Sequence, residues 1–462
     1  MSKTFLVIEY TRVEKSGIKD FFSFQDGRVV GALAKNANWV AEWRRVVDRP
    51  IWQYDELKEA GGADYLEFSS IFSQVISDPR VTYLLERRFK EDVLASVFNS
   101  VVVVEQICFG AFSVLKKVGA ERVIFHTPPH HLHDYLFSKI AEYLGLDVFV
   151  VKLSPLPWRA WLCSGIDEQR VVSRAVHLKN DLTETTKLYI ESLSGPYDQA
   201  MPEYERRLAS QAKGRMLSIN ADLKGAFTLI LSRHPLRSIF RLLAICRKIK
   251  LYKRYVNISR DFKLPQEFLV FFLHFQPERT SVPEGLSYSA QWLAIKEISE
   301  ALPAGVKLVV KEHQAMFRRQ LDPRTRDVEF YDAVAGLHNV VVAPLDFDTF
   351  TLLDLSKAIV TLTGTVGFEA LVRKKKVIAL GVAPYKDCDN VFSPRCYEDL
   401  VRALSQIDLS PSGDFLTEYL LWVEANSSCA ATLPDGKGIA YFNVESERQC
   451  INQEFRSAFL LV

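Results

Sequence analysis

The sequence has few features of disulfide-bonded, metal-binding or membrane-spanning proteins. Its seven cysteines are scattered and form no Cys-x-x-Cys pair, which argues against a structural zinc site or a redox motif and favours a reducing compartment. No run of about eighteen uncharged apolar residues predicts a membrane-spanning helix, and the apolar stretch near the N-terminus is too short for a signal-peptide core. We therefore expect a cytoplasmic protein.

An excess of charge of one sign is also missing. The 462 residues include 58 Lys and Arg against 56 Asp and Glu, a net charge of +2, which excludes a nucleic-acid-binding protein built on overall positive charge. Apolar residues make up 48% and charged residues 25%, as in soluble globular proteins. A chain of this length buries enough apolar surface to fold without disulfides, and two or three domains are expected.

Short apolar strands alternate with helical spacers in two parts of the chain, which predicts an α/β fold with parallel sheets. The expected N-terminal elements are a strand at 4–10, loops to residue 59, a helix at 83–118 whose segment 101–104 is alternatively a strand, and a strand–helix–strand unit at 122–125, 133–143 and 147–151. The expected C-terminal elements are strands at 268–272, 306–311, 339–342, 358–362 and 376–380, helices at 290–301, 349–356 and 365–373, and helical segments after residue 397.

These elements predict two Rossmann-like domains. We expect an N-terminal domain at 1–180 and a C-terminal domain at 264–400, with a ligand cleft between them beside the carboxyl ends of the strands. Residues 181–263 are expected to form a helical linker or insertion, and residues 401–462 to form helices that cross back to the first domain.

The segment Lys224–Arg260 differs from the rest of the chain in charge. It carries ten Lys and Arg residues and no Asp or Glu, and apolar side chains recur in it near helical spacing. A basic amphipathic helix of this kind can lie on an anionic membrane, where each basic residue contributes about 1 kcal/mol. The alternative is a solvated helical hairpin that links the two domains.

The segment Thr361–Leu371 holds the strongest candidate site. A β-branched strand runs into a Thr/Gly turn, and a helix is expected to start directly after it. Backbone N–H groups at such a helix start favour a phosphate, hydroxyls of Thr363 and Thr365 can add donors, and Gly364 lets a ligand approach the backbone. Glu369, one turn into the helix, is placed to accept ribose hydroxyls. The alternative is an ordinary capped helix with a solvated glutamate.

Two further groups of polar residues follow strands of the same half. Lys311, Glu312 and His313 come at the end of one strand, where ligand clefts form in this architecture. Gln276 and Glu278 come at the turn after another strand, and their amide and carboxylate groups suit sugar or base recognition. For the first group the alternative is that His313 has a structural role and that Lys311 and Glu312 form a surface ion pair. For the second group the alternative is a turn in which Gln276 and Glu278 form hydrogen bonds with otherwise unpaired backbone groups.

Four histidines lie between His126 and His133. On a helix only side chains three or four apart share a face, so His130 and Asp134 form the usable pair, and no His-Glu-x-x-His pattern occurs. We therefore expect no metal site. His130, His131 and Asp134 are instead the candidate catalytic residues, one of them serving as the base that deprotonates an acceptor hydroxyl.

Several of these segments together resemble a known family. FQPE followed by a Tyr and a Gln, then LPAGVKLVVKEH, LHNVVVAP and LSKAIVTLTGTVGFEALVRKKKVIALGVAPY occur in the order seen in the bacterial capsule polysaccharide biosynthesis family. That family includes the transferases that add 3-deoxy-manno-octulosonic acid (Kdo) to capsule lipid anchors. The resemblance is dense over about residues 268–387, and the N-terminal segment TPPHHLHDY fits the family only loosely.

The resemblance implies a GT-B glycosyltransferase with the nucleotide-sugar donor on the C-terminal domain, the acceptor on the N-terminal domain and no essential metal or cofactor. It assigns donor contacts to the residues that match the family's KEHP and TGTxGxEA motifs, namely Lys311, Glu312, His313, Thr363, Gly364, Thr365 and Glu369. Gln314 stands where the family has Pro, which would fix the backbone and hold the His313 ring toward the phosphate.

We therefore predict a metal-independent glycosyltransferase of bacterial capsule or surface polysaccharide biosynthesis. It would transfer a sugar from a nucleotide-sugar donor, with a CMP-linked sugar as one candidate, to a glycan or glycolipid acceptor. One alternative is a nucleotide-sugar epimerase or glycerophosphate-type transferase, and another is a degenerate, non-catalytic assembly protein, which Gln314 favours. The expected location is the cytoplasm, with peripheral contact to the inner membrane through Lys224–Arg260.

Overall fold

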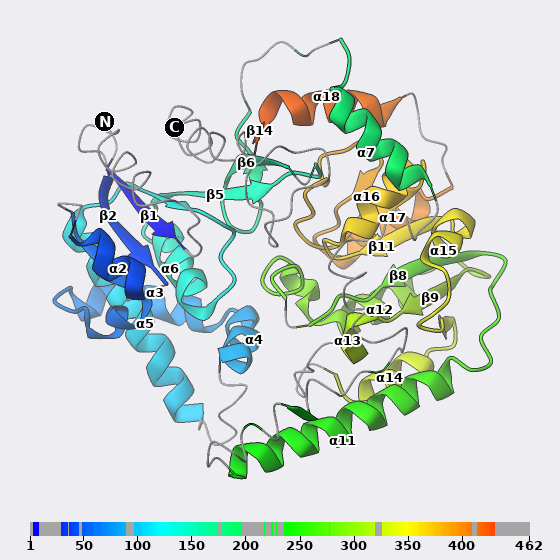
Figure 1. Cartoon of the computed structure of the whole chain (residues 1–462), viewed down its shortest axis with the longest axis horizontal. Coiled ribbons are helices and arrows are strands. Elements are labelled where there is room, and N and C mark those ends of the chain that lie inside the picture. The colour runs from blue at the N-terminus through cyan, green and yellow to red at the C-terminus, as the bar shows by residue number, and fades with distance from the viewer. Residues whose placement is uncertain are drawn as a thin grey trace. The chain divides into compact units, whose positions relative to one another are not determined.

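Two units of the chain have their own sheets and cores in the computed structural model (Figure 1). Unit 1 comprises Met1–Leu182 and Leu420–Val462, and unit 2 comprises Thr183–Tyr419. The structure describes residues 3–8, 29–35, 37–45, 49–88, 97–156, 158–173, 178, 180–195, 217, 223–224, 228, 235–276, 278–318, 326–408 and 414–429.

A mainly parallel sheet forms the centre of unit 1. Its described strands are β1 (Thr4–Ile8), β2 (Val29–Ala34), β3 (Ile51–Gln53), β4 (Arg122–Phe125), β5 (Asp147–Leu153), β6 (Arg159–Ser164), β7 (Arg170–Val171) and β14 (Ser428–Cys429). They lie in the order β14-β6-β5-β4-β1-β2-β3, with β7 beside β6. The strands from β5 to β3 are parallel, while β6, β7 and β14 add antiparallel pairs. Parallel strands are covered on both faces, and Phe5, Leu6 and Val7 of β1 are accordingly buried.

Helices pack against this sheet in unit 1. They are α2 (Ala37–Trp43), the 3₁₀ helix η1 (Tyr54–Glu59), α3 (Tyr65–Ile76), α4 (Pro79–Arg88), α5 (Val97–Val118) and α6 (Leu132–Tyr143). Of the described helices, one segment, Phe98–Val118 of α5, is long and apolar enough to cross a membrane, with a mean hydropathy of 1.6. Half of that segment is buried inside the protein.

The sheet of unit 2 has the strand order of a Rossmann domain. Its strands are β8 (Phe268–Phe272), β9 (Lys307–Lys311), β10 (Val340–Val342), β11 (Ala358–Thr361), β12 (Lys376–Ala379) and β13 (Val391–Phe392). They lie in the order β10-β9-β8-β11-β12-β13, and every described pair is parallel. Numbered from β8, this is the 3-2-1-4-5-6 order in which a crevice forms between the first and fourth strands, β8 and β11.

The helices of unit 2 lie on both faces of this sheet (Figure 1). They are α7 (Glu184–Ser194), α11 (Pro235–Ile258), η2 (Leu286–Ser289), α12 (Gln291–Ala301), α13 (Ala315–Arg318), α14 (Val328–Ala335), α15 (Thr349–Leu355), α16 (Thr365–Val372), α17 (Tyr397–Ser405) and the first part of α18 (Phe415–Asn426). The α/β fold class with two Rossmann-like units is thus confirmed, and the predicted cleft between them stays a prediction.

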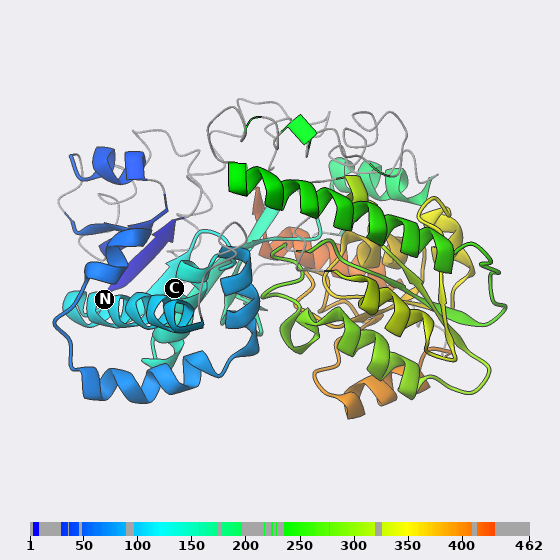
Figure 2. The same cartoon turned by 90° about the horizontal axis from the view of Figure 1, so that it is seen from below.

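Helix α11 lies along unit 2 (Figure 2). Leu251 and Tyr255 of α11 belong to the core that contains β8 and β9. Lys248, one of the ten basic residues of the predicted amphipathic segment, is only 1% exposed. Residues 183–195 and 235–263, which the sequence assigned to a linker, therefore pack within unit 2, and α18 leads back to unit 1, where β14 pairs with β6.

The predicted elements agree best in the C-terminal half, where every predicted strand and helix from 268 to 380 is confirmed to within two residues. The helix predicted at 83–118 is confirmed in α4 and α5, and the alternative strand at 101–104 is wrong; residues 89–96 lie outside the described residues. The loops predicted up to residue 59 are wrong for β2, α2 and β3. Val29–Ala34 is a short apolar run without alternation, which is typical of a buried parallel strand.

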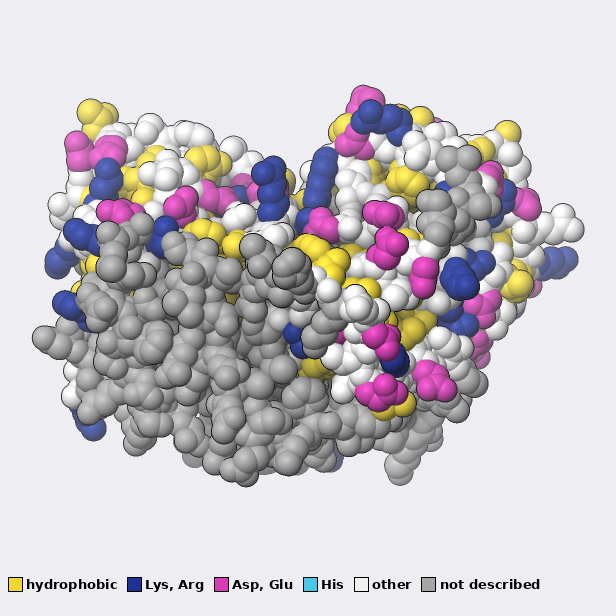
Figure 3. Space-filling model, turned by 90° about the horizontal axis from the view of Figure 1, so that it is seen from above, with side chains coloured by type: hydrophobic (Ala, Val, Ile, Leu, Met, Phe, Trp, Pro, Cys, Tyr) yellow, Lys and Arg dark blue, Asp and Glu magenta, His cyan; other side chains and the backbone are white. Residues whose placement is uncertain are grey.

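Charges of both signs are mixed on the face of the protein drawn in Figure 3. On the face drawn in Figure 3, Lys and Arg side chains are interspersed with Asp and Glu wherever the structure describes the surface. This agrees with the nearly balanced composition of the chain.

Candidate functional site

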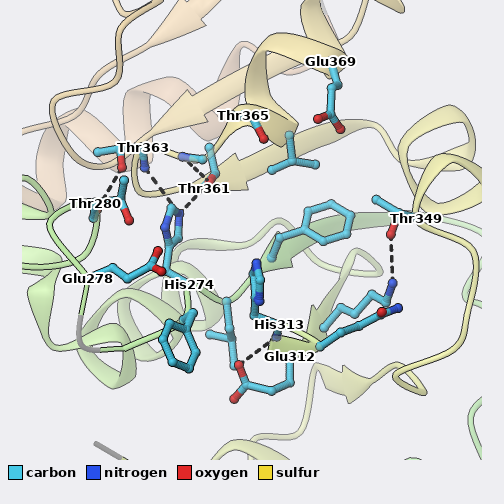
Figure 4. A pocket seen from close by; sticks show the side chains of 17 residues that line it. His274, Glu278, Thr280, Glu312, His313, Thr349, Thr361, Thr363, Thr365 and Glu369 are labelled. Atoms are coloured by element: carbon cyan, nitrogen blue, oxygen red, sulfur yellow. Dashed lines mark hydrogen bonds between the residues drawn. The ribbon is translucent and has the colours of Figure 1, made fainter. Parts of the chain in front are cut away.

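A cavity of about 200 Å³ opens at the carboxyl ends of β8, β9 and β11 in unit 2 (Figure 4). This is the position at which the strand order of the sheet predicts a crevice. The cavity is lined by residues 272–275, 278, 280, 311–314, 349, 361, 363–366 and 369. It brings together every predicted donor-binding residue except Gln276.

His274, two residues after β8, holds the turn that precedes α16. Its Nε2 atom accepts the backbone N–H groups of Leu362 at 3.2 Å and Thr363 at 3.4 Å, and lies 3.0 Å from Oγ1 of Thr361. Because an N–H group can only donate, Nε2 carries the lone pair and the ring is neutral. Burial lowers the pKa of His274 to about 3, so the ring stays neutral near pH 7. His274 therefore shapes the turn and adds no charge to it.

Two glycines let the turn and α16 pack closely against their neighbours. A Cβ atom at Gly364 would lie 2.9 Å from Oγ1 of Thr361 and 3.2 Å from the His274 ring, although the φ of −67° suits any residue. A Cβ atom at Gly367 would lie 2.1 Å from the Tyr385 hydroxyl, which donates to the Gly364 carbonyl at 2.5 Å. Packing thus requires glycine at both positions, independently of any ligand.

The start of α16 offers backbone donors to the cavity. Gly364 is the N-cap residue, and no side chain caps the helix. Thr365 and Val366 are its first two residues, whose N–H groups have no acceptor within a helix, and both line the cavity. The helix dipole adds about 0.3–1 kcal/mol of attraction for an anion here, and up to about 2 kcal/mol in a partly buried site. The Thr363 hydroxyl donates instead to the Thr280 carbonyl at 2.8 Å and holds the turn.

The end of β9 adds nitrogen donors on the other side of the cavity. Lys311 is 4% exposed, and its Nζ donates to Oγ1 of Thr349 at 2.9 Å. His313 accepts the backbone N–H of Ala315 on Nδ1 at 3.1 Å, so the hydrogen of the neutral ring is on Nε2. Lys311 therefore brings a positive charge to the cavity and His313 a ring N–H donor, both of which suit a phosphate.

Glu312, between these two residues, is satisfied within the protein. One oxygen, Oε2, accepts from Nε of Arg326 at 3.1 Å and from the Tyr331 hydroxyl at 2.8 Å. The other, Oε1, accepts the backbone N–H of His313 at 2.8 Å. The side chains of Glu312 and Arg326 are 0% and 2% exposed. These contacts occupy the oxygens that a donor hydroxyl would need, and they brace the end of β9.

Gln276 lies behind the cavity instead of lining it. Its Oε1 accepts from a terminal nitrogen of Arg326 at 2.5 Å, and its Nε2 donates to the Ser289 carbonyl at 3.0 Å. Arg326 also donates to the His274 carbonyl at 3.4 Å and so links the ends of β8 and β9. Sequence reasoning missed Arg326, because nothing in the segment between β9 and α14 marks one basic residue as buried.

Two carboxylates lie at opposite ends of the cavity (Figure 4). Glu369, one turn into α16, is 7% exposed and points toward the cavity, while its neighbours Phe368 and Leu371 are buried in the core, as predicted. Glu278 follows β8 and lies far from Glu369, with His313 and Thr365 between them. The Thr/Gly turn and the carboxylate one turn along the helix therefore line the same cavity, and their role in binding a ligand stays a prediction.

Gln314, which stands in place of the family's proline, is held by a hydrogen bond. Its Nε2 donates to the Leu345 carbonyl at 3.1 Å, which ties the turn after β9 to the segment after β10. The side chain thus restrains the backbone beside His313 by a different means from a proline ring.

The predicted catalytic residues lie in unit 1, before and within the first turn of α6. The Asp134 carboxylate accepts the backbone N–H groups of His130 at 3.2 Å and Tyr135 at 2.9 Å. His131 lies 2.7 Å from Nζ of Lys35 through its Nε2. His130 places Nδ1 3.2 Å from the Pro128 carbonyl, which can only accept, so Nδ1 carries the hydrogen and Nε2 the lone pair.

Among the residues that the structure describes, no group of three or more His, Cys, Asp and Glu side chains could hold a metal ion. His133, the last of the four clustered histidines, stacks on Tyr54 with ring centroids 5.2 Å apart and lies 3.8 Å from the Asp55 carboxylate. Packing contacts with Tyr54 and Asp55 therefore explain the position of His133.

Comparisons with known structures give low similarity over most of the chain. The Kdo 2,7 transferase of Thermosulfurimonas dismutans KpsC is 11% identical, with 99% of each chain covered and a TM-score of 0.33. The Kdo 2,4 transferase of the same protein is 13% identical, with 72% of this chain and 88% of that one covered and a TM-score of 0.32. UDP-GlcNAc 2-epimerase from Neisseria meningitidis is 12% identical, with 98% and 100% covered and a TM-score of 0.22.

The fold assignment accordingly rests on the two sheets described above. Curated protein sequences give no match to the chain. A family profile does match residues 286–388, which run from η2 through β9 and α16 and carry most of the cavity, and its description is capsule polysaccharide biosynthesis protein. The family that the sequence resembles is thus also the one whose profile matches residues 286–388.

Proposed function

We propose that the chain is a glycosyltransferase of bacterial capsule or surface polysaccharide assembly, with its nucleotide-sugar donor bound in the cavity of unit 2. The observation that carries this proposal is the convergence of anion-binding groups on one cavity: the N–H groups of Thr365 and Val366, the Lys311 ammonium and the His313 ring. Glu369, one turn along α16, can accept ribose hydroxyls. The family match supports the biological process.

The transfer breaks the bond between the anomeric carbon and a phosphate oxygen and joins that carbon to an acceptor oxygen, while the acceptor hydroxyl gives its proton to a base. Negative charge therefore grows on the leaving phosphate. Donors that are already in place around this charge lower the barrier, and removing one such donor typically slows a reaction by about 10²–10³. In this proposal His313, Lys311 and the start of α16 supply those donors.

For the base, the candidates remain the three residues of unit 1. A base needs a lone pair facing the acceptor hydroxyl. The contact with the Pro128 carbonyl places a lone pair on Nε2 of His130, while His131 lies beside Lys35 and the Asp134 carboxylate accepts two backbone N–H groups. All three residues therefore stay candidates for the base.

We further propose that the reaction needs neither a metal nor another cofactor, because the Lys311 charge and the helix start can balance the phosphate charge. The donor can be tested by incubating the protein with CMP- and UDP-linked sugars, with and without glycan acceptors, in the presence of EDTA. Consumption that requires both donor and acceptor and survives EDTA supports the proposal. Consumption without any acceptor indicates an epimerase, and no consumption together with no binding indicates a non-catalytic protein.

Contact with a membrane is a further part of the proposed function. On α11 the described side chains of Ile239, Leu242 and Leu243 are 53%, 42% and 59% exposed, and Lys250 and Lys253 are exposed farther along the helix. We propose a cytoplasmic protein that touches anionic lipid through this face of Lys224–Arg260. Flotation with vesicles containing anionic lipid tests it, because Leu242→Asp with Leu243→Asp should abolish binding while neutral vesicles bind neither protein.

A further inference from the structure

A buried cluster behind the cavity connects the residues of the proposed donor site to two helices. Its centre is the ion pair between Glu312 and Arg326, whose side chains are 0% and 2% exposed. Arg326 is absent from the cavity lining, but two of its partners, His274 and Glu312, line the cavity. Any effect of Arg326 on a ligand must therefore act through those partners.

The start of α14 holds Arg326 in place. The N-cap residue Asp327 accepts the backbone N–H of Phe330 at 2.7 Å, which fixes the first turn of the helix. The guanidinium of Arg326 lies 4.5 Å from the centroid of the Phe330 ring, a cation–π contact. From the same turn, Tyr331 donates its hydroxyl hydrogen to Glu312 at 2.8 Å. Arg326, just before α14, and Tyr331, in its first turn, thus supply two of the three donors that the Glu312 carboxylate receives.

Helix α11 supports the same cluster from the other side. The Tyr255 hydroxyl accepts the backbone N–H of Glu312 at 3.0 Å and donates to the Ala343 carbonyl at 2.6 Å. Arg247 donates to the backbone carbonyl of Arg326 at 3.2 Å. The rings of Tyr255 and Tyr331 meet edge to face with centroids 5.2 Å apart. Side chains that the sequence assigned to a linker therefore brace the end of β9.

The cluster fixes both sides of the cavity through one guanidinium. Toward β9, Arg326 holds Glu312, whose other oxygen accepts the backbone N–H of His313. Toward β8, Arg326 holds Gln276 and the carbonyl of His274, whose ring orders the turn before α16. Arg326 also balances the negative charge of Glu312. Without Arg326 an unbalanced negative charge would lie next to the residues proposed to bind the phosphate.

We propose that Arg326 is a positioning residue for the phosphate of the donor. This inference rests on the proposed function, since it assumes that His313 and the start of α16 bind that phosphate. Losing Arg326 removes no ligand contact. It instead releases the two strand ends that carry the contacts and leaves a buried carboxylate without its counter-charge. Binding of a phosphate-bearing ligand should therefore weaken more than binding of the same nucleoside without phosphate.

The test compares CMP with cytidine and UDP with uridine on the full chain, using calorimetry for the nucleotides and ligand-observed NMR for the nucleosides. For Arg326→Gln we expect a loss of at least tenfold in affinity for whichever nucleotide the wild type binds, with less than a threefold change for its nucleoside. The control is Arg254→Gln, which breaks the exposed ion pair between Arg254 of α11 and Asp332 of α14 and should change neither affinity more than twofold.

A second variant covers the case in which Arg326→Gln fails to fold. In the double variant Glu312→Gln with Arg326→Gln no charge is buried alone, and the single amide oxygen of the new side chain at position 312 can still accept from either Tyr331 or the backbone N–H of His313. We expect this variant to fold and still to lose at least tenfold in nucleotide affinity, because Gln276 and His274 are no longer held. Wild-type affinity in a folded variant, or an equal loss for nucleotide and nucleoside, would overturn the inference. A wild type that binds no nucleotide contradicts the proposed function itself.

Discussion

His274 and His313 have opposite roles in the same cavity, and backbone hydrogen bonds set the difference. His274 accepts N–H groups on Nε2, so its lone pair is used to order the turn before α16. His313 accepts an N–H on Nδ1, so its hydrogen is on Nε2 and can be donated. The sequence shows both histidines after strands but does not show which nitrogen carries the hydrogen, because that depends on the local backbone geometry.

Replacing either end of the donor site should lower transfer. We expect His313→Ala and Glu369→Ala each to reduce the rate at least tenfold, because hydrogen bonds to charged groups are worth about 1.5–3 kcal/mol. His313→Gln, which keeps an N–H donor on a side chain of similar length, should lose less than His313→Ala. The measurement is the rate of transfer at saturating acceptor, with the melting temperature as a check of folding. Unchanged turnover in both alanine variants would disprove the site assignment.

Gln314 should contribute through its hydrogen bond to the Leu345 carbonyl. Gln314→Ala removes that bond, worth about 0.5–1.5 kcal/mol, and should weaken nucleotide binding a few-fold. Gln314→Glu should weaken it more, because a carboxylate would face a carbonyl oxygen and would place a negative charge in the cavity proposed to bind the phosphate. Calorimetric affinities that rank glutamate at or above alanine would show that the side chain does not restrain the turn.

At the scale of elements, close packing of α16 on Tyr385 makes Gly367 sensitive to any added atom. In Gly367→Ala the new methyl group would lie 2.1 Å from the Tyr385 hydroxyl, so Tyr385 must move and lose its bond to the Gly364 carbonyl. Overpacking of this kind costs about 1–3 kcal/mol. We expect a lower denaturation midpoint and weaker nucleotide binding. Gly145→Ala, at a positive φ of 73° in unit 1, is the control and should lower stability but leave nucleotide affinity unchanged.

An ion-pair network that joins α4 and α6 to the β6–β7 hairpin should make unit 1 sensitive to acid. Burial of Asp167 raises the pKa of its carboxyl group. Hydrogen bonds from Arg80 and the positive charge of Lys139 outweigh this effect and lower the pKa to about 2. A carboxyl whose pKa is lower in the folded state stabilises the fold above its unfolded pKa of about 3.9, and this contribution is lost as the pH falls toward about 2.

The variant Asp167→Asn should therefore melt below the wild type at pH 7, and the difference should shrink between about pH 4 and pH 2. The matched control is Glu168→Gln, which breaks the exposed pair with Arg170 and should have little effect at any pH. A difference between Asp167→Asn and the wild type that is the same at pH 7 and pH 3 would contradict this account.

The sequence predicts the elements of unit 2 well because its parallel strands are short apolar runs with turn residues on both sides. The end of β9 and the turn before α16 could be predicted for the same reason: polar residues directly follow apolar strands. Arg326, Tyr255 and Tyr331 could not be predicted, because they reach Glu312 from α11, α14 and the segment before it. Such contacts depend on how helices far along the chain pack onto a strand end, which no local pattern encodes.

At the scale of the whole molecule, the net charge of +2 does not show that several basic residues of α11 form contacts within unit 2. Lys248 is buried, Arg247 binds the Arg326 carbonyl, and Arg254 pairs with Asp332. These residues serve the packing of unit 2, so fewer of the ten basic residues remain to meet a lipid surface than the sequence suggests.

The central claim is that unit 2 binds the nucleotide of a sugar donor, and the melting temperature of the wild-type protein with added nucleotides tests it most directly. At 100 times its Kd a ligand adds about 2.7 kcal/mol of stability, and about 1 kcal/mol raises the midpoint of a unit of this size by about 2–4 °C. We predict a rise of about 5 °C or more with CMP or UDP, absent in His313→Ala; a preference for CMP would favour a Kdo-like donor. If no nucleotide raises the melting temperature, or if His313→Ala responds as the wild type does, the claim is wrong.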